Sequence, residues 1–283
     1  MKEKSKKLSK KIIFAIVCAA IIGTIVIACI GMQIAFVIAD KIQCYHPDYE
    51  KVDISGILEK KELSEDDYAL LYRQTGLTKL GVDRALERGE TGIKRITRIQ
   101  DSYFKEYKVI NEFFCPYVCQ DKIDGYAENV YLEDGDIIVS SSTHLSGWRV
   151  GHAGLVTSAT GNKVLQASAI GEASDFGTIR DFTDRVNFIV LSPKVDKQTK
   201  SEVVDFAAKN LQGKIYDPTA GVFSSKNSAD KTQCAHLAWY AYNQFGIDLD
   251  CNGGLVVTPK DIANSPLVEV VQVFGFDPVK LWK

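Results

Sequence analysis

The chain has 283 residues, with 34 lysines and arginines against 36 aspartates and glutamates, so its formal net charge is −2. The first eleven residues carry +5, which leaves −7 for the rest of the chain. A surface of that sign repels phosphate backbones, and we therefore do not expect the chain to bind nucleic acid.

A basic tail, residues 1–11, is followed by 28 residues without a charged side chain, residues 12–39. A bilayer-spanning helix needs about 20 apolar residues, whereas the core of a cleaved signal peptide has about 7–15. The sequence therefore predicts one retained transmembrane anchor. Because the lysines precede it, we expect the tail in the cytoplasm and the rest of the chain outside the cell membrane. A lipoprotein cleavage site at Cys29 is the alternative, although the residues after it remain apolar.

Residues 44–130 carry two helical patterns. Ser64 precedes three acidic residues and an apolar face, which is typical of a helix start, and Gly76 fits the end. A second apolar pattern covers residues 78–88 and ends at Gly89. The sequence therefore predicts a small helical region after the anchor.

Three short runs rich in β-forming residues come next, bounded by turn residues: 135–140, 149–157 and 163–168. The last two can pair across the turn at residues 159–162. The pairing would bring Gln166 close to His152. Histidine accepts a proton near neutral pH, and an amide oxygen on the adjacent strand can hold its ring.

A late helix is predicted from residue 232, with Thr232 as its cap and Gly246 as its stop. Cys234 falls in its first turn, where backbone N–H groups and the helix dipole favour a thiolate, the nucleophilic form. A buried packing role for the cysteine is the alternative reading, since free cysteines are often part of a core.

Outside the anchor there are five cysteines, an odd number: Cys44, Cys115, Cys119, Cys234 and Cys251. Cysteines of extracytoplasmic proteins tend to pair, and an unpaired one is a candidate reactive thiol. Cys115 and Cys119 are close enough in sequence to bridge.

The order of four segments resembles a known family. The segments are, in order, a GDII strand, a GHAGLV strand with the histidine, a VLQAS strand with the glutamine and a helix opening QCAHLAWYAY. This order is similar to that of the permuted NlpC-type, papain-like cysteine amidases of the YiiX kind. In this group, and in relatives of lecithin:retinol acyltransferase, the histidine precedes the cysteine. The likeness covers residues 131–273, about half of the chain.

The resemblance implies an α+β fold. Residues 131–283 would form a circularly permuted papain-like catalytic domain with a central antiparallel sheet and a nucleophile helix. One transmembrane helix (12–39) and a small helical region (44–130) would precede it.

The resemblance also assigns roles: Cys234 would be the nucleophile, His152 the base, and Gln166 the residue that orients the ring. Glutamate is frequent at this third place, and a carboxylate there would hold an imidazolium proton longer. Such a Cys–His pair works as thiolate and imidazolium. Four further residues are candidates for contact with the substrate or its oxyanion: His144, Trp148, Arg149 and Tyr216. The scheme requires no metal site and no organic cofactor.

The leading hypothesis is a membrane-anchored extracytoplasmic cysteine amidase or peptidase. Its substrate would be a peptide or other amide, including cell-wall or lipid-linked ones. An acyltransferase or lipid hydrolase on the same fold is the second hypothesis, and a non-catalytic binding module is the third.

Overall fold

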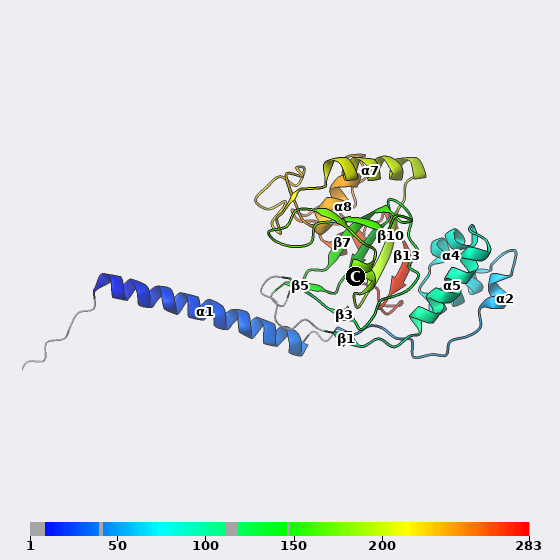
Figure 1. Cartoon of the computed structure of the whole chain (residues 1–283), viewed down its shortest axis with the longest axis horizontal. Coiled ribbons are helices and arrows are strands. Elements are labelled where there is room, and N and C mark those ends of the chain that lie inside the picture. Colours follow the sequence, from blue (N-terminus) through cyan, green and yellow to red (C-terminus); the bar gives the residue numbers. More distant parts are fainter. Residues whose placement is uncertain (1–8, 40–41, 111–117, 146–147, 283) are drawn as a thin grey trace, which may run out of the picture. The chain divides into compact units, whose positions relative to one another are not determined.

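The computed structural model of the chain describes residues 9–39, 42–110, 118–145 and 148–282 (Figure 1). The chain forms two compact units. One contains residues 1–41 and 146–148, and the other contains residues 42–145 and 149–283.

Helix α1 (Lys10–Ala39) dominates the first unit. At 1.5 Å per residue, its 30 residues extend over about 45 Å, more than the roughly 30 Å of a bilayer's hydrocarbon core. Among the described residues it is the one helix that is long and apolar enough to cross a membrane. The expectation of a single membrane-spanning segment at this place therefore has a matching helix.

Four helices open the second unit: α2 (Ser55–Leu58), α3 (Glu65–Thr75), α4 (Lys79–Leu86) and α5 (Glu90–Tyr103). The predicted boundaries of α3 are confirmed. Ser64 caps it in a capping box with Asp67, and Gly76 ends it in the left-handed conformation at φ +71°.

A six-stranded sheet follows, in which every neighbouring pair is antiparallel. Its order is β13 (Val268–Phe274), β10 (Phe188–Pro193), β4 (Ile137–Ser140), β7 (His152–Ser158), β8 (Lys163–Gln166) and β9 (Asp175–Gly177). The predicted pairing of β7 with β8 is confirmed, with Leu155 opposite Leu165. The α+β class expected from the sequence, with a central antiparallel sheet, is therefore observed.

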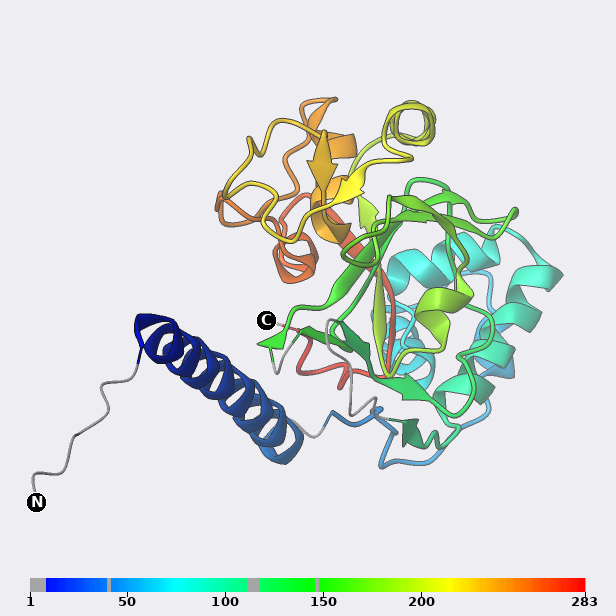
Figure 2. The ribbon, with the colours of Figure 1, turned by 60° about the vertical axis from the view of Figure 1, so that its left-hand side comes forward.

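The two faces of the sheet bury different helices (Figure 2). Residues of α7 (Lys197–Asn210), α8 (Cys234–Asn243) and α9 (Pro259–Ala263) share one core with the sheet. Residues of α2 to α5 and of the short helix α6 (Arg180–Thr183) share the other. Side chains alternate along a strand, so Ile137 and Val139 of β4 enter the first core and Ile138 enters the second.

Three smaller sheets are present among the described residues. β1 (Val109–Ile110) pairs with β3 (Lys122–Ile123), and β5 (Thr143–Leu145) lies between β2 (Cys119–Gln120) and β6 (Trp148–Arg149). β11 (Ile215–Tyr216) pairs in parallel with β12 (Lys231–Thr232), immediately before α8. The last pairing holds Tyr216 opposite Thr232, two residues before Cys234.

Candidate active site

Cys234 is the first residue of α8, as the sequence indicates, but the predicted cap is wrong. The capping residue is Gln233, whose side-chain oxygen accepts a hydrogen bond of 2.9 Å from the Ala235 N–H. Thr232 lies one residue too early, because it belongs to β12. Its hydroxyl lies 2.9 Å from Nδ1 of His236, which is a fully buried packing residue.

The sulfur of Cys234 is buried, with 6% of the residue exposed. Burial raises the pKa of its thiol, because a thiolate loses hydration in this position. The backbone N–H groups of Ala153 and Ala235 and the cationic Arg185 oppose this shift without cancelling it. The thiol also donates to the Gln233 side-chain oxygen at 3.4 Å, an interaction available only to the protonated form.

His152 is the first residue of β7 and is 3% exposed. Its ring stacks on Phe182 at 5.1 Å between centroids. Burial, and then the nearby charge of Arg185, lower the pKa of His152 to about 3. The site therefore favours a neutral thiol and a neutral imidazole at rest. This corrects the expectation of a thiolate–imidazolium pair, which considered the helix dipole but not the depth of the pocket.

Strand register explains how Gln166 reaches His152. Leu155 faces Leu165 across β7 and β8, so Gly154 is level with Gln166 and His152 is its diagonal neighbour on the same face. Diagonal neighbours lie about 7–8 Å apart, within reach of a long side chain. Oε1 of Gln166 lies 2.7 Å from Nε2 of His152, so the predicted contact between these two residues is present.

The other end of the Gln166 amide meets a residue that the sequence analysis missed. Nε2 of Gln166 donates a 2.7 Å hydrogen bond to Oδ2 of Asp181 in α6. The nearby sequence also offers two other carboxylates, Glu172 and Asp175. Asp175 is the strand partner of Gln166, but its side chain is exposed and accepts from Gln212.

Cys234 and His152 line one pocket of about 450 Å³. Most of its other walls are apolar, with two cations and few neutral polar groups. The remaining lining residues are Val118, Thr143, Leu145, Arg149, Val150, Gly151, Ser168, Ile170, Tyr216, Pro218, Gln233, Val256, Val257, Thr258, Pro259, Lys260 and Trp282. Enclosure on this scale suits a small or extended organic substrate.

Two of the four predicted contact residues line the pocket, and two do not. Arg149 and Tyr216 line the pocket. Burial and the neighbouring Cys234 raise the pKa of the Tyr216 hydroxyl, which therefore remains a proton donor. His144 is buried with its Nε2 3.7 Å from Asp121, and it is not among the pocket residues. Trp148 is 71% exposed and belongs to the unit that contains α1.

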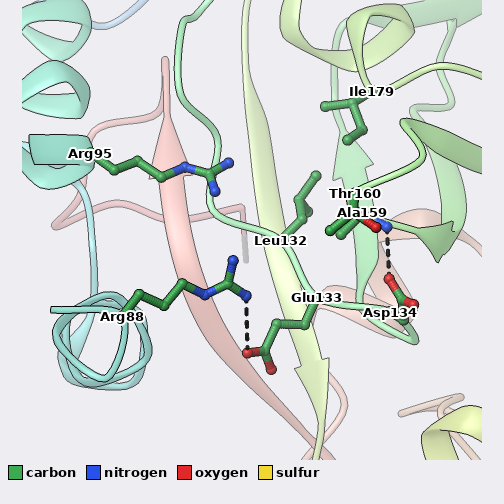
Figure 3. A pocket seen from close by; sticks show the side chains of 8 residues that line it. All are labelled: Arg88, Arg95, Leu132, Glu133, Asp134, Ala159, Thr160 and Ile179. Atoms are coloured by element: carbon green, nitrogen blue, oxygen red, sulfur yellow. Dashed lines mark hydrogen bonds and ion pairs between the residues drawn. The ribbon is translucent and has the colours of Figure 1, made fainter. Parts of the chain in front are cut away.

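A second pocket, of about 310 Å³, lies between the helical region and the sheet (Figure 3). Arg88, which follows α4, and Arg95 of α5 both reach into this pocket. The guanidinium of Arg88 lies 3.8 Å from the carboxylate of Glu133. Asp134 accepts from the Ala159 N–H at 2.7 Å. The described lining residues of this pocket include neither a cysteine nor a histidine.

Comparison with known proteins gives a limited likeness. The chain is similar to YycO of Bacillus subtilis, described as an uncharacterized protein, with 29% identity over 133 residues. The similar region is 45% of this chain and 51% of YycO, so the chain spans about half the length of the curated relative that it matches. No protein-family model matches the chain, and no solved structure matches it.

Proposed function

We propose that this chain is a membrane-anchored cysteine hydrolase that cleaves amide bonds outside the cytoplasm, in a permuted papain-like domain of the NlpC type. The observation that carries the proposal is the shared pocket. A cysteine at the start of a buried helix and a histidine held by Gln166 border the same pocket. Peptides, including those of cell walls, are the substrate class that the family resemblance favours.

The reaction would begin with a neutral pair. The Cys234 sulfur attacks the carbonyl carbon as its proton moves to Nδ1 of His152, the ring nitrogen that Gln166 leaves free. The carbonyl oxygen becomes an oxyanion. The Cys234 backbone N–H can donate to it, and the protonated Tyr216 hydroxyl in the same pocket is a second donor.

Collapse of this intermediate would expel the amine, which takes the proton from the His152 imidazolium and leaves a thioester on Cys234. Water then loses a proton to Nδ1 as it attacks the thioester. The acid leaves, and the thiol regains its proton. Arg185 disfavours the imidazolium because it is a buried cation nearby, so the charged state would be brief.

Activity-based labelling tests the proposal. Full-length protein in detergent is treated with an alkyne-tagged, peptide-like electrophile, and the modified residue is mapped by mass spectrometry. We expect the label on Cys234, and we expect loss of labelling in His152→Ala. Cys251 is the internal control, because it is an exposed thiol outside the pocket. Labelling of Cys251 at the same rate as Cys234 contradicts the proposal.

The apolar walls of the pocket favour acyl transfer or lipid hydrolysis as the second candidate. Val150 and Ile170 both border the pocket and are 42% and 49% exposed. Apart from His152 and Cys234, the ionisable side chains among the described lining residues are Arg149, Lys260 and Tyr216. Product analysis separates the candidates: a hydrolase releases free acid, whereas an acyltransferase gives a product that depends on an added amine or alcohol.

A further inference from the structure

The amide of Gln166 is held at both ends. Its oxygen faces Nε2 of His152 and its nitrogen faces Oδ2 of Asp181, each at 2.7 Å. An amide can be turned by 180° with little change in shape, so the neighbours must decide which end faces the histidine.

Asp181 decides it. Its Oδ2 accepts from the Thr178 backbone N–H at 3.0 Å, and its Oδ1 accepts from the Thr178 hydroxyl at 3.1 Å. An ionised carboxylate only accepts, so the group that faces it must be the NH₂ of Gln166. The Gln166 oxygen is then left for His152, and a neutral imidazole must carry its proton on Nε2 to use it.

We propose that Asp181 is a positioning residue that fixes the Gln166 amide and thereby holds the proton of neutral His152 on Nε2, leaving Nδ1 as the basic nitrogen. The inference rests on the proposed role of His152 as the base. It adds a fourth residue, which contacts neither the substrate nor the reacting atoms, to the machinery of the site.

Gly177 gives independent support. A Cβ built on this glycine would lie 2.0 Å from Nε2 of Gln166 and 2.2 Å from Oδ2 of Asp181. The backbone of β9 therefore passes directly against the Gln166–Asp181 bond, and only a residue without a side chain leaves room for it. Both atoms are the ends of side chains that can move, so Gly177→Ala should break the hydrogen bond without breaking the fold.

The proton position on His152 can be measured without a substrate. Full-length protein is labelled with ¹⁵N in its histidine rings, and the ring nitrogen shifts are recorded by NMR in detergent micelles. His152→Gln identifies the His152 signals among the four histidines. We expect wild type to show a protonated Nε2 and an unprotonated Nδ1.

Three variants separate positioning from folding. Asp181→Asn keeps an oxygen acceptor and should keep the wild-type tautomer. Asp181→Leu and Gly177→Ala should give a mixture with protonated Nδ1, and each should slow the alkylation of Cys234 by about tenfold, because general-base help is lost. Gly56→Ala is the matched control, since a Cβ there meets nothing within 4 Å.

An unchanged tautomer in folded Gly177→Ala overturns the proposal, as does a wild-type His152 that is protonated on Nδ1. Gly177→Ala decides the question even where Asp181→Leu does not fold. Failure of the enzyme proposal looks different: Cys234 would then label no faster than Cys251 in wild type, whatever tautomer His152 has.

Discussion

Cys234 of α8 lies close enough to Ala153, the residue that follows His152 in β7, for the Ala153 backbone N–H to lower the pKa of the Cys234 thiol. This proximity links the start of α8 to the strand that carries His152. N–H groups directed at sulfur support negative charge, yet burial outweighs them and raises the pKa of the Cys234 thiol. In the proposed reaction these N–H groups would therefore stabilise charge on sulfur as it develops, whereas the thiol is neutral at rest.

The pH dependence of Cys234 alkylation tests this arrangement. Because the pKa of the thiol is raised and that of His152 is lowered to about 3, the rate of reaction with iodoacetamide should climb steadily with pH through 7 and continue beyond 9. Mass spectrometry of quenched samples gives the rate. A plateau between pH 5 and 8 would instead reveal a stable thiolate–imidazolium pair.

Replacing Cys234 should remove activity and spare the fold. Cys234→Ala deletes one sulfur from a helix start, and we expect a stability loss of only about 1 kcal/mol together with complete loss of hydrolysis. Cys115→Ala and Cys251→Ala should keep hydrolysis. Thermal unfolding and product release are the two measurements, and full activity in Cys234→Ala would end the cysteine-hydrolase interpretation.

The sequence predicted the structure correctly where a local pattern is compatible with one structure only. The capping box at Ser64, the glycine after α3 and the pairing of β7 with β8 follow from local chemistry and periodicity, and all are present. Cys234 and His152 could be nominated because few residues serve as nucleophile and base. The predicted Cys115–Cys119 bridge lies partly outside the described residues and stays a prediction.

A contact that depends on tertiary placement, such as the one between Gln166 and Asp181, could not be predicted from the sequence. Asp181 is fifteen positions from Gln166, and no spacing rule joins a strand residue to a short helix two elements later. For the same reason, the group that a glutamate at position 166 would face could not be predicted from the sequence. With Asp181 in place, Gln166→Glu would set two carboxylates against each other, and one of them would have to keep a proton.

Acid should destabilise the folded protein partly through His152. Its pKa is about 3 when folded and about 6.5 when unfolded, so the unfolded state binds the proton first as pH falls below 6.5. The associated loss of stability reaches about 2 kcal/mol near pH 5. His152→Gln should therefore show a smaller fall in melting temperature between pH 7 and 5 than wild type. An equal fall in both proteins would place the titrating groups elsewhere.

The orientation of the chain in a membrane can be read with Cys251. This thiol is exposed and lies in the second unit, while Cys18 and Cys29 lie in α1. With the lysines inside, a membrane-impermeant maleimide added to intact cells should modify Cys251, as located by mass spectrometry, and the modified peptide should be missing in Cys251→Ser. Labelling that appears only after lysis would put the second unit in the cytoplasm.

Removing the buried charge of Asp136 should lower the stability of the fold strongly. Its carboxylate accepts from Lys200 of α7 at 2.8 Å and from Arg84 of α4 at 3.0 Å, and both cations also contact the Ser192 hydroxyl. Asp136 and Lys200 are buried. The carboxylate thus joins helices that pack on opposite faces of the sheet.

Asp136→Ala leaves the buried Lys200 without its anion and leaves Arg84 with Glu133 alone, so we expect a loss of about 3–5 kcal/mol in the free energy of unfolding. Lys200→Met should cost less, because Arg84 still compensates Asp136 and the new side chain is apolar. Lys94→Met breaks an exposed pair with Glu90 and should change stability by less than about 1 kcal/mol. Urea unfolding of the three variants gives the order. If Lys200→Met proves as damaging as Asp136→Ala, the lysine holds the helices through packing of its stem and not through its charge.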